Sequence, residues 1–128
     1  MALDPSADVL RFIETHIDSV ELLHVLMFLV DRKGESWPTA AISRELRSSE
    51  SSVNMRVRTL VERKLLAADA LKDGKVEYRA GANAPESVVI EALAYYKLAP
   101  YRVVEMIFSK RTNAIQSIAD AFRFRKED

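Results

Sequence analysis

Apolar residues recur every three or four positions in two stretches near the start of the chain. The first runs from Val9 to Ile17, and the second, from Val20 to Val30, is apolar around most of a helix. This spacing predicts two helices, the second of them central to the core. Asp4 and Asp18 stand where a side chain can accept hydrogen bonds from the first free N–H groups of each helix, so we expect them to be the caps.

The middle of the chain predicts two further helices joined by a tight turn. Residues 36–38 are expected to be extended, because a residue before proline avoids the helical conformation. Thr39 then caps a short helix. The turn Arg47-Ser48-Ser49 breaks this helix and supplies the cap of the next one. From Glu50 to Lys64 apolar residues again keep helical spacing. The buried face of this longer helix is expected to consist of Val53, Val57, Leu60 and Val61.

After residue 66 the pattern changes to that of a hairpin. Asp73 and Gly74 form a dipeptide typical of the turn between antiparallel strands, here residues 67–71 and 76–79. Helical spacing then returns for the rest of the chain. There we expect a helix capped by Asn83 and broken at Pro100, a resumed helix, and a last helix capped by Asn113.

Composition and charge narrow the class of protein. The chain has 128 residues, of which 48% are hydrophobic, and it contains no cysteine, which excludes disulfides and thiolate metal sites. The first residues lack the pattern of a secretory signal, and the most apolar run is shorter than the roughly 20 residues of a membrane span. We therefore expect a cytoplasmic protein with no membrane partner.

Charge is unevenly distributed although the formal net charge is zero. The segment before Trp37 is acidic, whereas residues 44–79 carry more arginine and lysine than aspartate and glutamate. This modest basic excess supports a nucleic-acid partner without requiring one.

The predicted elements of residues 37–79 have the order of a winged helix-turn-helix. Within them, Thr39 to Leu46 is followed by the serine-containing turn and by a helix that leads into the pair Leu65-Leu66. This segment resembles the small bacterial transcriptional regulators of the MarR-like kind. In one departure, Lys64 stands where many such proteins have glycine, so the exit of the helix is expected to differ.

The resemblance implies a mainly α fold with a small β-hairpin wing and additional C-terminal helices. It divides the chain into a winged helix-turn-helix domain over residues 1–82, which includes the N-terminal helices, and a C-terminal helical dimerisation segment over residues 83–128. We expect the two to pack as one compact unit. The helix over residues 50–64 would be the recognition helix that enters the major groove of DNA.

The outward face of the helix over residues 50–64 carries the candidate DNA contacts, since a step of about 100° per residue sets them opposite the buried face. Arg58 suits bidentate contact with guanine, and Met55 suits a thymine methyl group. Lys72 and Lys75, at the hairpin tip, are placed to meet the adjacent DNA backbone or the minor groove. The expected set, with Arg47 and Arg56 on phosphate, is Arg47, Ser51, Ser52, Met55, Arg56, Arg58, Thr59, Lys72 and Lys75.

The helical segment after Asn83 exceeds what one small core can cover. We expect it to form a two-fold homodimer, which would set two recognition helices about one duplex turn apart and favour a palindromic site. The alternative is that these helices fold back on their own chain. The expected interface residues are Val88, Leu93, Tyr96, Val103, Ile107 and Phe108.

The function that these patterns favour is a DNA-binding transcriptional regulator. The alternative is a winged-helix module that binds a protein, which the near-neutral charge favours. An enzyme is not expected, because the sequence lacks a glycine-rich phosphate loop, a nucleophile elbow and an interpretable pair of histidine and carboxylate.

The histidines and tyrosines leave two smaller questions open. His16 and His24 stand eight residues apart, which is no recognised ligand spacing, so we expect no metal and no cofactor. His24 is expected to be a hydrogen-bonded core or interface residue. Three tyrosines near Pro100 either line an effector pocket or simply pack: Tyr95, Tyr96 and Tyr101.

Overall fold

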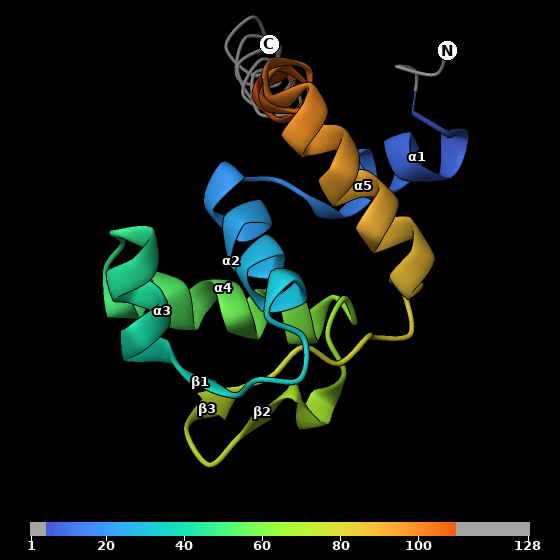
Figure 1. Cartoon of the computed structure of the whole chain (residues 1–128). Coiled ribbons are helices and arrows are strands. Elements are labelled where there is room, and N and C mark those ends of the chain that lie inside the picture. The colour runs from blue at the N-terminus through green and yellow to red at the C-terminus, as the bar shows by residue number, and fades with distance from the viewer. Residues whose placement is uncertain (1–4, 110–128) are drawn as a thin grey trace, which may run out of the picture.

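The computed structural model describes residues 5–109, which form a mainly helical chain with a small sheet (Figure 1). The elements follow in the order α1 (Ala7–His16), α2 (Val20–Asp31), β1 (Trp37–Pro38), α3 (Thr39–Leu46), α4 (Glu50–Glu62), the 3-10 turn η1 (Ala68–Ala70), β2 (Leu71–Lys72), β3 (Lys75–Val76) and α5 (Glu86–Leu98). Residues 100–109 are again helical. The predicted class, mainly α with a small β-hairpin, is confirmed at this level.

Serine hydroxyls cap three of the helices. Ser6, Ser19 and Ser49 accept hydrogen bonds from the backbone N–H three residues later at the starts of α1, α2 and α4. Only Ser49 belongs to the turn that was expected to supply a cap. The prediction that Asp18 caps the second helix is wrong, because the next residue, Ser19, is the cap. The carboxylate of Asp18 accepts a hydrogen bond from Arg63.

Prolines occupy the cap positions of α3 and α5, where no side chain accepts a hydrogen bond. The expectation of a Thr39 cap is therefore wrong, and Thr39 is the buried first residue of α3. Asn83 lies two residues before the cap of α5 and donates its side-chain amide to the carbonyl of Arg63. The predicted break at Pro100 is confirmed, since Ala99 leaves the helical conformation. The last predicted helix, capped by Asn113, lies outside the described residues.

The sheet has β3 in its centre, with β1 and β2 antiparallel on its two sides. Trp37 and Leu71 are both paired with Val76. The turn between β2 and β3 has positive φ angles of 54° at Asp73 and 76° at Gly74, as a two-residue hairpin turn requires. The predicted hairpin is confirmed, but its strands are shorter than expected because residues 68–70 form η1.

A single apolar core joins the helices. Helix α2 packs against α3 and α4, while α1 packs against α5 (Figure 1). Val53, Val57 and Leu60 of α4 are buried in this core as predicted, and Val61 is partly buried. The C-terminal segment takes part in it too, through residues such as Val89 and Leu93 of α5. Among the described residues, no helix has the length and apolarity needed to cross a membrane.

Candidate nucleic-acid interface

The face of α4 opposite its buried residues is open to solvent. Met55 is 51% exposed, and Arg58 is exposed as well. Together with their neighbours they form a shallow hollow of about 420 Å³ along the helix. It is lined by Ser51, Asn54, Met55, Arg58, Thr59 and Glu62. Four members of the predicted DNA-contacting set therefore lie on one continuous surface.

The guanidinium of Arg58 is the main cationic group of this hollow. Within residues 5–109 it takes part in no ion pair, so its donors are available to an external acceptor. Thr59 donates its hydroxyl to the carbonyl of Met55 at 3.0 Å, which occupies one of its hydrogen-bonding capacities. Glu62 adds a negative charge to the same hollow and reduces its overall attraction for phosphate.

Two residues of the expected set are held by α2 instead. Arg56 donates from Nε to Oε1 of Glu21 at 2.9 Å, and the hydroxyl of Ser52 donates to the same oxygen. The Ser52 hydrogen bond, followed by the contact with Arg56, lowers the pKa of Glu21 from its ordinary value of 4.5. Arg56 and Ser52 thus help to fix the position of α4, and Glu21 already accepts hydrogen bonds from two side chains that the sequence assigned to DNA.

A second contact holds the far end of α4. Arg63, just after the helix, donates to the carbonyl oxygen of His16 at 2.6 Å and to Oδ2 of Asp18 at 2.7 Å. No contact of Arg63, Asp18 or Glu21 at this site was predicted from the sequence. The only signal in the sequence was the seven-residue spacing of Arg56 and Arg63, which sets two cations on one side of a helix while an acidic segment precedes it.

The hairpin β2–β3 carries the other predicted basic group. Lys72 and Lys75 are direct partners across the hairpin, and both are exposed. Neither forms an ion pair with another residue of the described range, whereas the nearby Arg79 lies 3.8 Å from Asp69 and 3.9 Å from Glu77. The two lysines line one surface hollow with Arg79 and with three carboxylates, so the charges in that hollow balance: Asp69, Asp73 and Glu77.

Arg47 stands in the turn between α3 and α4. Its φ of 56° is left-handed and ends α3, and its side chain is exposed. The structure thus leaves seven residues of the expected set exposed or half-exposed without a carboxylate partner among the described residues: Arg47, Ser51, Met55, Arg58, Thr59, Lys72 and Lys75.

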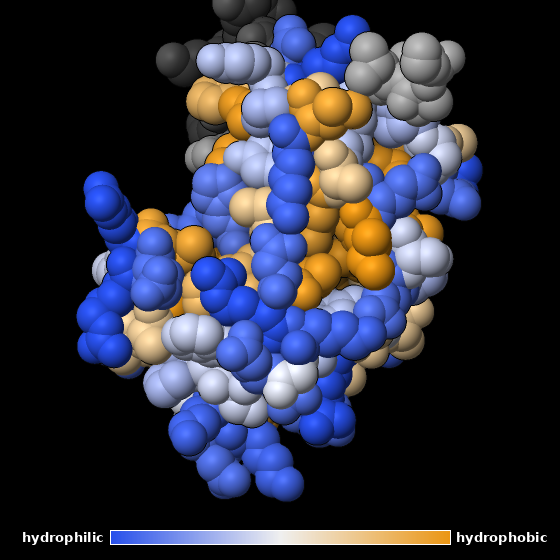
Figure 2. Space-filling view, in the orientation of Figure 1, coloured by the Kyte–Doolittle hydropathy of each residue, from blue (hydrophilic) through white to orange (hydrophobic). Residues whose placement is uncertain are grey.

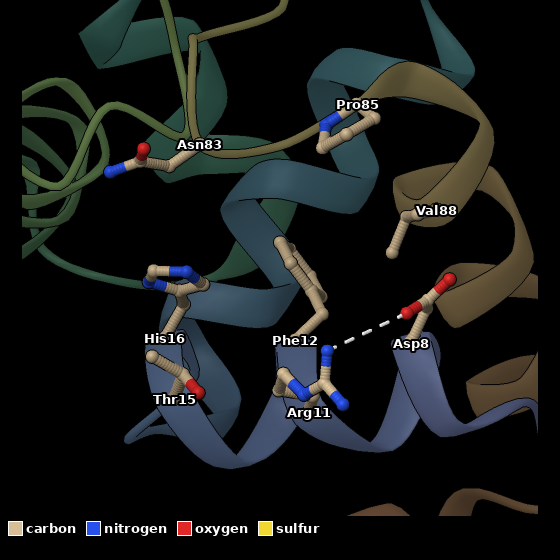
Figure 3. A pocket seen from close by; sticks show the side chains of 8 residues that line it. All are labelled: Asp8, Arg11, Phe12, Thr15, His16, Asn83, Pro85 and Val88. Atoms are coloured by element: carbon tan, nitrogen blue, oxygen red, sulfur yellow. Dashed lines mark ion pairs between the residues drawn. The ribbon is translucent and has the colours of Figure 1, made fainter.

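A separate cavity of about 340 Å³ opens between α1 and the start of α5 (Figure 3). Its apolar wall includes Phe12 and Val88, and its rim carries Asp8 and Arg11, whose charged groups are 3.8 Å apart. The exposed position of both groups makes this a weak ion pair. The full lining is Asp8, Arg11, Phe12, Thr15, His16, Asn83, Pro85 and Val88.

The three tyrosines near Pro100 have different surroundings. Tyr95 is buried, Tyr101 is 88% exposed, and the hydroxyl of Tyr96 lies 2.7 Å from Nε2 of His24. This arrangement favours packing over a shared effector pocket. It also confirms that His24, which is half-buried, is a hydrogen-bonded residue.

The expected dimer interface needs the largest correction. Leu93, Val103 and Ile107 are buried in the chain's own core, so a second chain is not needed to cover them. Val88 and Tyr96 are half-buried, and of the six residues only Phe108 is exposed. Helix α5 is apolar around most of its circumference, so its sequence could not identify the inward side. The large apolar side chains that α5 leaves exposed are Ile90 and Leu98.

No group of three or more histidines, aspartates or glutamates within the described residues is arranged to hold a metal ion. Comparisons with models of protein families, with curated proteins and with solved structures find no match to the chain.

Proposed function

We propose that the chain is a winged-helix protein that binds double-stranded DNA, with α4 as its recognition helix and the hairpin β2–β3 as its wing. The observation that carries the proposal is the division of α4 into two faces. Val53 and Val57 anchor it in the core, while the side chains of Met55 and Arg58 on the other side form no hydrogen bond or ion pair among the described residues. A helix that reads the major groove needs this combination.

Base recognition is assigned to the middle of the exposed face of α4. Arg58 presents its guanidinium to the N7 and O6 acceptors of a guanine, and the thioether of Met55 contacts a thymine methyl group. Ser51 and the small residues around it leave the first turns of α4 uncluttered, so the helix can approach the floor of the groove. These contacts would supply sequence preference.

Contacts with the phosphate backbone of DNA are assigned to basic residues that flank α4. Lys72 and Lys75 meet the backbone beside the groove that α4 occupies, and Arg47 meets it near the start of α4. Each neutralised phosphate releases counterions, so the affinity falls as the salt concentration rises. The contacts held by Glu21 and Asp18 keep α4 fixed relative to α2 during this encounter.

The proposal includes two chains on one DNA site. A single α4 reaches only one half-site, and a two-fold pair would read a palindrome with half-sites about one turn of duplex apart. Such a dimer is suited to regulating transcription by occupying DNA near a promoter. No catalytic role is proposed.

A second candidate is a winged-helix module that binds a protein. The zero net charge supports it, and so does the presence of Glu62 and Asp73 on the two surfaces assigned to DNA. Binding to a pool of random-sequence duplexes, measured by gel shift over a range of salt concentrations, separates the two. The DNA proposal expects an affinity that falls steeply with salt. Absence of a shift at low salt would overturn it and favour the protein-binding alternative.

A further inference from the structure

The hollow on α4 includes one polar side chain outside the set predicted to contact DNA. Asn54 lines this hollow together with Met55 and Arg58. Asn54 is half-buried, and within residues 5–109 its side-chain amide forms no hydrogen bond, whereas the hydroxyls of Ser52 and Thr59 on the same helix do. The amide oxygen and the two N–H groups of Asn54 are therefore available to a molecule that enters the hollow.

Asn54 and Arg58 lie on the same side of α4, one turn apart. They are separated by four residues in the sequence, so at about 100° per residue their side chains leave the helix about 40° apart. The same separation corresponds to about 6 Å along the helix axis. Base pairs in duplex DNA follow one another at about 3.4 Å. When α4 lies along the major groove, the two side chains therefore reach positions one or two base pairs apart.

The two side chains differ in the base edge that they match. The amide of Asn54 has an acceptor and a donor in one plane, and the edge of adenine in the major groove offers the N6 amino group as donor and N7 as acceptor. Guanine offers two acceptors at this edge, thymine one acceptor and cytosine one donor, so each satisfies only half of the amide. The guanidinium of Arg58 carries donors alone and matches guanine.

We infer that Asn54 is a second base-reading residue of α4, and that it reads an adenine one or two base pairs from the guanine contacted by Arg58. The inference rests on the proposed function, because it concerns the same surface. It goes further by naming the class of duplex that this surface takes. Such a duplex has an A·T pair and a G·C pair that are adjacent or separated by one base pair.

Discrimination between bases requires that α4 be held in one position in the groove. The buried side chains of Val53 and Val57 fix the inner face of α4, and Arg56 joins the helix to Glu21 of α2 at 2.9 Å. Asn54 has only two side-chain torsions, so little conformational entropy is lost when it binds. Hydrophilic residues cover the end of the molecule that carries the hairpin β2–β3 (Figure 2), where contacts with the DNA backbone would keep α4 in register.

Base substitution in a selected duplex gives the first test. The preferred duplex is selected from a random-sequence pool, each of its base pairs is replaced in turn, and fluorescence anisotropy measures the Kd. The wild type should lose about tenfold in affinity when the A·T pair is replaced. Asn54→Ala should lose this preference for adenine and keep the preference for guanine. Arg58→Ala is the matched variant, which should lose the preference for guanine and keep that for adenine.

Replacement of the adenine by 7-deazaadenine gives a second test, because it removes the N7 acceptor and leaves the base pair intact. The wild type should bind the modified duplex several-fold more weakly, whereas Asn54→Ala should bind both duplexes equally. Alanine forms helices more readily than asparagine, so Asn54→Ala should keep the far-ultraviolet circular dichroism of the wild type.

The outcomes separate this inference from the proposed function. A wild-type chain that binds no duplex would overturn the proposed function and the role of Asn54 with it. A wild-type chain that prefers a site without an adenine within two base pairs of the guanine would overturn the role of Asn54 alone. So would an adenine preference that persists in Asn54→Ala, an equal loss of affinity for every duplex in that variant, or a wild-type affinity unchanged by 7-deazaadenine.

Discussion

Nε of Arg56 donates a hydrogen bond of 2.9 Å to Oε1 of Glu21, which joins the middle of α4 to the start of α2. Ser52, one turn earlier on α4, donates its hydroxyl to the same carboxylate oxygen. With Arg63 bound to Asp18 at the other end, α4 is held by two carboxylates that precede or begin α2. The helix that we propose to read DNA is therefore positioned from its sides, and its exposed face remains clear.

The first prediction concerns the contribution of Glu21 to stability. Glu21→Gln should lower the free energy of unfolding at neutral pH by about 0.5–1 kcal/mol, because the pair with Arg56 is partly exposed. The hydrogen bonds lower the pKa of Glu21 in the folded state below the unfolded value near 4.5, so the stabilisation is present above that pH. It should disappear as the pH falls through the lower, folded pKa.

Urea denaturation from pH 3 to pH 7 measures this effect. The difference in stability between the wild type and Glu21→Gln should be full above the unfolded pKa near 4.5 and should shrink as the pH falls below that value. The matched control is Glu14→Gln on the exposed surface of α1, for which no difference is expected at any pH. A difference for Glu21→Gln that stays constant down to pH 3 would contradict the assigned cause.

The second prediction concerns Gly81, which follows the hairpin. A Cβ atom at this position would lie 2.1 Å from the carbonyl oxygen of Lys64 and 2.8 Å from the carbonyl carbon of Leu65. These are backbone atoms at the exit of α4, so relief requires the chain itself to move. We expect Gly81→Ala to lower the free energy of unfolding by about 3 kcal/mol.

The control for Gly81→Ala is Gly34→Ala. Gly34 has a φ of 91° but open space around a Cβ atom, so only backbone strain of about 1 kcal/mol is expected there. Thermal unfolding followed by circular dichroism compares the two variants. Equal losses of stability in Gly81→Ala and Gly34→Ala would mean that the close contact with Lys64 is not the reason for a glycine at position 81.

The third prediction concerns Tyr78. Its hydroxyl is buried and has no hydrogen-bond partner among the residues that the structure describes. Burial, followed by the charge of Glu86, raises the pKa of Tyr78 above its ordinary value of 10.0. We expect Tyr78→Phe to leave the free energy of unfolding at pH 7 unchanged or to raise it by about 1 kcal/mol, since an uncompensated polar group is removed.

The pH dependence of the free energy of unfolding tests the raised pKa of Tyr78. Because the folded pKa of Tyr78 lies above the unfolded one, the wild type should lose stability as the pH rises above 10, and Tyr78→Phe should lose less. Tyr101→Phe, at an exposed position, serves as the comparison. A clear loss of stability in Tyr78→Phe at pH 7 would reveal a hydrogen bond to this hydroxyl.

Periodicity predicted the positions of the described helices well, because burial of one side of a helix leaves a direct mark on the sequence. The turn of Asp73 and Gly74 was equally predictable, since few dipeptides adopt two positive φ angles. Lys64 shows a limit of predicting backbone conformation from residue type, because a lysine at this position was expected to change the exit of the helix. It adopts a φ of 60°, the left-handed conformation that glycine adopts most readily, so the chain makes this turn with a lysine.

Contacts between distant segments were not predictable. Neither the Glu21–Arg56 pair nor the addition of β1 to the hairpin leaves a local pattern, because each depends on how α2 and the sheet pack. The same applies to α5, whose apolar residues on several sides gave no indication that Leu93 faces inward and Ile90 outward. The exposed surface of α4 was predictable because its two faces differ in polarity along the whole helix.

In the proposed complex, the exposed face of α4 reads DNA and the hairpin meets the DNA backbone. Selection of duplexes from a random-sequence pool supplies a preferred site, and fluorescence anisotropy then compares this site with random duplexes. Arg11→Ala, on the exposed surface of α1, is the matched control and should bind both as the wild type does.

The deciding measurement is the ratio of the affinities for the selected and random duplexes in Arg58→Ala and Lys75→Ala. Arg58→Ala should weaken binding to the selected site by about tenfold or more and leave binding to random duplexes nearly unchanged. Lys75→Ala should weaken both about equally and lower the slope of log affinity against log salt by about one. Failure of the wild type to bind either duplex, or an equal loss on both duplexes in Arg58→Ala, would contradict the account.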